Sequence, residues 1–183
     1  GAFVSMGKEA VNAQRNIENL QLNIGTLLGD ADKGKELVAE LQKYGEATPY
    51  DTEGLASAAQ TMLAYGVSAQ QIMPLMKQLG DVAQGNTEHL QGLALAFGQM
   101  TAVGTVQKQD LNQMASAGFG FNQIAKSMGV SVAEFLDMVS KKKVHVSDIA
   151  KALQDATSAG GLFYHSALNA SKGLEGTFSN FEE

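Results

Sequence analysis

The amino-acid sequence predicts an all-α fold, with a compact multi-helix core of short helices flanked by longer N- and C-terminal helices. Three observations predict this fold. Apolar residues recur at spacings of three and four in nearly every segment, as they do on one face of a helix. Ala, Leu, Gln and Met, which favour helices, are frequent. Gly and Pro residues separate the apolar segments, and the best strand candidate is only residues 144–146. We expect seven to nine helices.

Residues 1–29 are predicted to form one long, coiled-coil-like N-terminal helix, which Gly29 ends. Its apolar side chains follow one another at alternating intervals of four and three residues. This narrow stripe is typical of a helix that packs along another helix. The candidate helix-pairing seam consists of Met6, Ala10, Ala13, Ile17, Leu20, Ile24 and Leu27.

Residues 30–159 are predicted to form the compact helical core domain, because helix-start and helix-stop signals alternate along them. Ser131 followed by Glu134 is a capping-box pattern, in which each side chain accepts from the other residue's backbone N–H. Ser147 and Asp148 are expected to cap the next helix. The predicted helices cover about 32–44, 52–65, 68–82, 86–103, 110–117, 121–128, 131–140 and 147–159.

Pro74 interrupts the helical pattern of residues 68–82. A proline inside a helix removes one backbone hydrogen bond, whereas a proline in the first turn is well tolerated. The segment therefore either kinks at Pro74 or begins a new helix there. We expect a new helix.

The hydrophobic core is expected between Ala31 and Ala156, where the apolar residues fall on one face of each predicted helix. Large apolar side chains on these faces should exclude water from the centre of the domain. The predicted core residues are Leu41, Leu55, Met62, Leu63, Leu75, Leu79, Leu93, Phe97, Leu111, Ile124, Phe135 and Leu153.

Residues 160–183 are predicted to form a C-terminal helix after a hinge at Gly160 and Gly161. Apolar residues again form a stripe along this helix. An exposed stripe of this size would be an unusually large apolar patch. We therefore expect the two terminal helices to pair, either with each other or with a neighbouring copy of the chain. The C-terminal stripe consists of Ala167, Ala170, Leu174, Phe178 and Phe181.

The sequence contains no catalytic, cofactor-binding or metal-binding pattern. His89, His145 and His165 are far apart, and none forms a metal-binding pair at helical spacing. The absence of cysteine excludes disulfides and thiolate metal sites. We therefore predict that the chain is not an enzyme and binds no cofactor.

Charge and hydropathy narrow the range of partners. The net charge of −6 would repel a phosphate backbone, so we expect no nucleic acid specificity. Residues 90–107 carry no charged side chain, but their Gln, Thr and Gly residues favour a buried core helix over a membrane span. Membrane contact is expected only in a full-length protein. The start at Gly1 indicates a segment of a longer polypeptide.

Several segments, taken in order, resemble the helical region of phage tail tape-measure proteins. The resemblance covers about residues 20–180, and it depends on the order and spacing of turn signals beside apolar residues. The matching segments are 26–29 (TLLG), 41–44 (LQKY), 47–50 (ATPY), 63–68 (LAYGVS), 79–81 (LGD), 95–100 (LAFGQM), 109–113 (QDLNQ), 117–119 (AGF), 140–141 (SK), 144–146 (VHV) and 156–164 (ATSAGGLFY).

This resemblance implies a structural role in the virion tail. Proteins of this family help to set tail length and to organise the tail lumen. Their expected partners are other copies of the chain, tail tube proteins and tail assembly chaperones, first in the host cytoplasm and then in the virion. Two alternatives remain open: a membrane-active helical module used in genome ejection, and a cell-wall-degrading enzyme domain.

Overall fold

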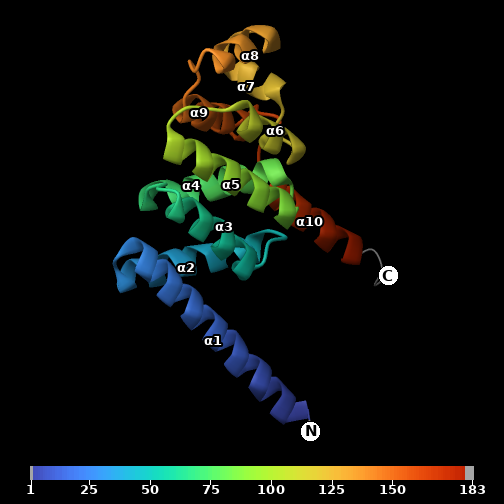
Figure 1. Cartoon of the computed structure of the whole chain (residues 1–183). Helices are drawn as coiled ribbons and strands as arrows, with labels where there is room; N and C mark the ends of the chain where they lie inside the picture. The colour runs from blue at the N-terminus through green and yellow to red at the C-terminus, as the bar shows by residue number, and fades with distance from the viewer. Residues whose placement is uncertain (1, 180–183) are drawn as a thin grey trace.

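The computed structural model describes the backbone of residues 2–179 and the side chains of residues 7–173 (Figure 1). Over this part of the chain there are ten helices and no strand, which confirms the all-α prediction. The expected seven to nine helices were too few, because each predicted helix forms as a separate element. The helices are α1 (Ala2–Leu28), α2 (Ala31–Ala47), α3 (Thr52–Ala64), α4 (Ala69–Ala83), α5 (Thr87–Val103), α6 (Lys108–Ser116), α7 (Phe121–Met128), α8 (Val132–Ser140), α9 (Val146–Thr157) and α10 (Ser166–Ser179).

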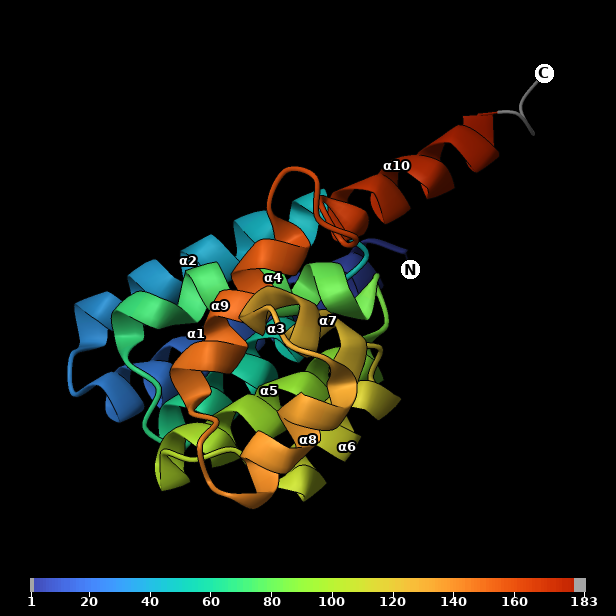
Figure 2. The ribbon, with the colours of Figure 1, turned by 90° about the horizontal axis from the view of Figure 1, so that it is seen from above.

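The helices are stacked from one end of the body to the other (Figures 1 and 2). In Figure 1, α2 and α3 lie at one end of the body, α4 and α5 in the middle, and α7 and α8 at the other end. Packing contacts join α2 to α3, α3 to α5, α4 to α9, and α7 to α9. In Figure 1, α1 and α10 both extend beyond the body towards the right. In Figure 2, α10 projects from the body, while α1 lies behind the body with its N-terminal end towards the same side.

Short polar side chains begin several helices at the predicted positions. The Asp51 carboxylate accepts from the Gly54 backbone N–H at 2.7 Å, and the Ser131 hydroxyl accepts from the Glu134 backbone N–H at 3.1 Å. The first N–H groups of a helix have no partner within the helix, so each cap satisfies one of them. Two further caps of this kind are Asp30 and Asn86.

The start of α9 lies earlier than predicted. The helix begins at Val146 with His145 as its N-cap, not at Ser147. The Asp148 carboxylate, in the first turn of α9, accepts from the His145 backbone N–H at 2.9 Å. The backbone N–H of the N-cap residue therefore has a hydrogen-bond partner. Residues 144–146, the best strand candidate, form only an isolated antiparallel bridge between His145 and Thr105.

Pro74 lies inside α4, so the predicted new helix at this position was wrong. The proline has no N–H for the carbonyl of Gln70, but Gln70 is exposed and its carbonyl can bond to water. The apolar side chains of Ile72 and Met76 are fully buried on the same helix. Their burial on one continuous face outweighs the loss of one backbone hydrogen bond.

The hydrophobic core contains eleven of the twelve predicted core residues, while Leu63 is only partly buried against it. The core also extends beyond the predicted limits of residues 31–156. Ile24 of α1 and Ala167 of α10 are fully inaccessible to solvent, and Phe163 is 5% exposed. The inner ends of both terminal helices therefore belong to the core.

Helix α5 is a core helix, which agrees with the preferred interpretation of residues 90–107. Leu90, Leu93 and Ala94 are completely buried, and Phe97 is 3% exposed. Within the described residues, no helix is long and apolar enough to cross a membrane.

Candidate functional site

Helices α1 and α2 form an antiparallel hairpin whose backbones touch at two glycines. A Cβ atom at Gly34 would lie 2.6 Å from both the Cα and the N of Gly25, which is closer than real Cβ contacts. Asp30 begins α2 by accepting from the backbone N–H groups of Asp32 and Lys33 at 3.0 and 3.1 Å. The pair of glycines and this capped turn set the direction in which α1 leaves the body.

The inner half of the candidate seam lies against the body. Ile24 is fully buried, and Ile17 and Leu20 are partly buried against the core. Leu27 is 46% exposed, whereas the adjacent Leu28 packs against the core. The body therefore covers the seam of α1 as far out as Ile17.

The outer half of the seam lies in solvent. Ala10 and Ala13 are exposed, as are all residues from 7 to 16. The Met6 side chain lies outside the described residues. Because α1 reaches beyond the body here (Figure 1), no other element of the described structure covers this face.

Two exposed apolar residues of α1 were not included in the candidate seam. Val11 is 52% exposed and Leu22 is 66% exposed. They lie eleven residues apart, about three helical turns, so they share one face of α1. A search for apolar residues at spacings of three and four does not link them, because the intermediate positions are the charged Arg15 and Glu18.

Buried polar groups gather where α4 ends and α10 begins. The Tyr50 hydroxyl donates to the Gly80 carbonyl at 2.6 Å and accepts from the Gly85 backbone N–H at 2.9 Å. Burial raises the pKa of Tyr50 to about 12, so this hydroxyl remains protonated and can donate. The Tyr44 hydroxyl is buried beside Gly80 and has no hydrogen-bond partner within the described residues.

The Asp81 carboxylate joins this buried group to α10. Asp81 is 9% exposed, and its Oδ1 accepts from the Ala167 backbone N–H at 3.1 Å. Burial raises the pKa of Asp81, while the hydrogen bond from Ala167 and the nearby His165 oppose this rise. A carboxylate is favourable at this position because the first turn of a helix presents unpaired N–H groups and the positive end of the helix dipole.

A groove of about 710 Å³ lies beside this junction, between α2, α4, α9 and the start of α10. Met73, Pro74 and Leu168 give it an apolar surface, while Lys43 and Lys77 are charged groups on its wall. Within the described part of the chain, no group of three or more His, Cys, Asp or Glu side chains is placed to hold a metal ion.

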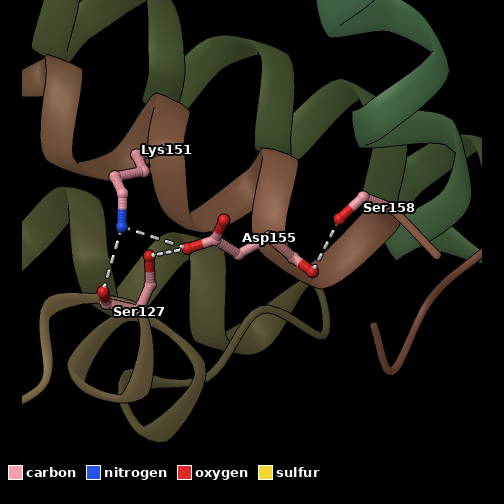
Figure 3. Close-up of polar contacts among 4 residues, drawn as sticks. All are labelled: Ser127, Lys151, Asp155 and Ser158. Atoms are coloured by element: carbon pink, nitrogen blue, oxygen red, sulfur yellow. Dashed lines mark hydrogen bonds and ion pairs between the residues drawn. The ribbon is translucent and has the colours of Figure 1, made fainter. Parts of the chain in front are cut away.

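An exposed polar cluster connects α7 to α9 (Figure 3). The Ser127 hydroxyl donates to the Asp155 carboxylate, and the Lys151 ammonium group lies 3.4 Å from the same carboxylate oxygen. Lys151 also donates to the Ser127 carbonyl at 3.3 Å, and the Ser158 hydroxyl donates to the Asp155 carbonyl at 3.3 Å. The contacts with Ser127 bridge two helices. The hydrogen bond from the Ser127 hydroxyl, followed by the hydrogen bond and positive charge of Lys151, lowers the pKa of Asp155.

Replacing Asp155 by asparagine should slightly reduce stability at neutral pH, because the neutral amide forms weaker bonds to Ser127 and Lys151. The lowered pKa of Asp155 means that its contribution is present above the ordinary value of 3.8 and is lost as pH falls through the folded-state value. Urea unfolding at several pH values should show a small difference at pH 7 that disappears in acid. A difference that grows in acid would contradict this assignment.

Comparison with known proteins gives one consistent result. The family model described as "Tape measure protein" matches residues 8–183. The chain is 24% identical over 163 residues to the "Probable tape measure protein" of Lactococcus phage p2, which covers 84% of this chain and 16% of that protein. It is 26% identical over 153 residues to the "Tape measure protein" of Lactococcus phage F4-1, which covers 78% of this chain and 40% of that protein. The chain therefore spans less than half of the length of either relative. No solved structure matches it.

Proposed function

Because the chain belongs to the tape measure protein family, we propose that it is a structural module of a phage tail that helps to set tail length and to organise the tail lumen. Stacked helices with a continuous buried core suit a module that carries load or holds a fixed shape. We assign no catalytic role to it. Among the residues whose side chains are described, two carboxyl groups are buried: Asp81 accepts the Ala167 backbone N–H, and Asp110 accepts a backbone hydrogen bond from Gln107.

The observation that carries the proposal, beyond the family itself, is the exposed outer half of α1. Here Ala10 and Ala13 continue the stripe that packs against the body further in, but no described element covers them. Small side chains at these positions allow a second helix to approach closely. We propose that this half of α1 pairs with α1 of another copy of the chain.

The proposal also includes the protein partners of the chain and its location during and after tail assembly. Tail tube proteins and tail assembly chaperones would assemble around the protein in the host cytoplasm, and the mature location is the virion tail. The family membership supports these assignments. Any cell-wall-degrading activity, or membrane contact during genome ejection, would then reside in other parts of the full-length protein.

Self-association should depend on the outer half of the seam. Replacing both Ala10 and Ala13 by aspartate places two charges on the proposed contact face, where pairing would bury them without partners. We expect the mass measured by analytical ultracentrifugation to fall to that of a monomer. The core should remain intact, because both positions are exposed.

A matched control separates the seam from a general effect of charge. Replacing Asn12 and Asn19 by aspartate also adds two negative charges to α1, but on exposed positions outside the candidate seam. This variant should keep the mass of the original chain. The seam is not the pairing surface if the original chain is a monomer at every concentration. The same conclusion follows if both double variants dissociate to the same extent.

A further inference from the structure

The connector between α9 and α10 is held by backbone hydrogen bonds. The Gly161 N–H donates to the Ser158 carbonyl at 2.8 Å, and the Phe163 N–H donates to the Ala156 carbonyl at 2.8 Å. A Cβ atom at Gly161 would overlap the carbonyl group of Ala156. Gly161 therefore lies tightly against the end of α9, and only glycine fits at this position.

Side chains from the connector and from α10 reach into the core. Phe163 is 5% exposed, and Ala167, in the first turn of α10, is fully buried. Further along α10, Ala170 faces the turn that follows α4, since a Cβ at Gly85 would lie 3.9 Å from the Ala170 Cβ. A connector that served as a free hinge would not bury residues on both sides of its bend.

Asp81 fixes the start of α10 from a helix far away in the sequence. Its bond to the Ala167 N–H joins residues that are 86 positions apart. Asp81 is 9% exposed and also borders the groove between α2, α4, α9 and α10, so its carboxylate is largely removed from water. Breaking this bond would leave a buried charge and an unpaired helix N–H group, and both are costly.

We propose that residues 158–167 form a rigid elbow, locked by Asp81, which fixes the direction in which α10 leaves the body. The glycine-lined contact between α1 and α2 fixes the other terminal helix. The body is thus a bracket that holds its two terminal helices at a set angle, both extending towards the same side (Figure 1). The fixed directions of α1 and α10 do not depend on the proposed function. Only their role in a phage tail rests on it.

The elbow can be tested by measuring a distance within one chain. The protein contains no cysteine, so pairs of spin labels can be attached without background. One pair, at Glu53 and Lys172, joins the body to α10, and a second pair, at Glu53 and Asn112, lies within the body; all three positions are exposed. Each pair is attached to its own doubly labelled chain, which is diluted with unlabelled chain so that distances between chains do not contribute. Pulsed electron paramagnetic resonance then gives the distance distribution of each pair.

The original chain should give a single narrow distance for both pairs. Asp81→Ala should broaden and shift the Glu53–Lys172 distance while the Glu53–Asn112 distance stays narrow. Asp81→Asn should restore the narrow distance, because the amide oxygen can accept the same N–H group. Asp110→Ala, which removes a carboxylate of similar burial at 8% exposure with no bond to α10, should leave the Glu53–Lys172 distance unchanged.

Gly161→Ala keeps the test decisive if Asp81→Ala disturbs the body. Its Cβ would overlap the Ala156 carbonyl group, so the connector must move and the distance to Lys172 must change. A broad Glu53–Lys172 distance in the original chain, or an unchanged one in both Asp81→Ala and Gly161→Ala, would overturn the elbow. These outcomes are independent of whether α1 pairs between copies, because the measured distances lie within one chain.

Discussion

Replacing Gly34 by leucine is expected to release α1 from the body. The backbone of α1 lies where the new side chain would be, since even a Cβ at this position would be 2.6 Å from the Gly25 Cα. Rotation of a side chain cannot relieve an overlap with backbone, so the two helices must separate. Overpacking of this kind costs about 1–3 kcal/mol or more. Separation would also expose Ile24, which is fully buried in the original chain.

Hydrogen exchange measured by mass spectrometry would show the release directly. Amides in residues 17–28 should lose protection in Gly34→Leu, while the amides of α4 and α5 keep theirs. Gly7→Ala is the control, because this glycine lies on α1, the helix that is expected to be released, but an added Cβ there would have no atom within 4 Å. Alanine there should stabilise the exposed helix by about 1 kcal/mol. Unchanged protection of residues 17–28 in Gly34→Leu would show that the close contact does not hold α1.

Replacing Phe97 by alanine should strongly destabilise the body. Phe97 is 3% exposed in the centre of α5, so its removal leaves a cavity that the surrounding helices cannot fill completely. Such substitutions reduce the free energy of unfolding by about 3–5 kcal/mol. For a domain of this size, each kcal/mol lowers the melting temperature by about 2–4 °C.

Chemical unfolding followed by circular dichroism would measure this loss. Val103→Ala provides the control, because Val103 belongs to the same helix but is 59% exposed. Its replacement should change stability by less than about 0.5 kcal/mol. A loss below about 1 kcal/mol for Phe97→Ala would mean that the core is centred elsewhere.

The sequence alone determined the fold class, most helix limits and most of the core. These features depend on interactions between residues close together in the chain. Asp51 caps its helix through the N–H of Gly54, three residues away, and Ser131 does the same through Glu134. Helical periodicity places Leu93 and Phe97 on one face, and a face of this kind must be buried whichever helix covers it.

Local signals were wrong at two places in the chain. Pro74 predicted a new helix, but the burial of Ile72 and Met76 keeps α4 continuous. Ser147 and Asp148 predicted the cap of α9, but the helix starts at Val146. In the first case, the packing of many atoms outweighs the preference of a single residue.

Only the tertiary structure decided which parts of the terminal helices are buried and which residues hold them against the body. The seam of α1 keeps the same spacing along its length, yet Ile24 is fully buried while Ala10 is exposed, because α2 and the body cover only its inner half. Asp81 and Ala167 meet across 86 residues, and no sequence spacing predicts that bond. Periodicity tells which face of a helix is apolar, but what covers that face depends on the path of the whole chain in space.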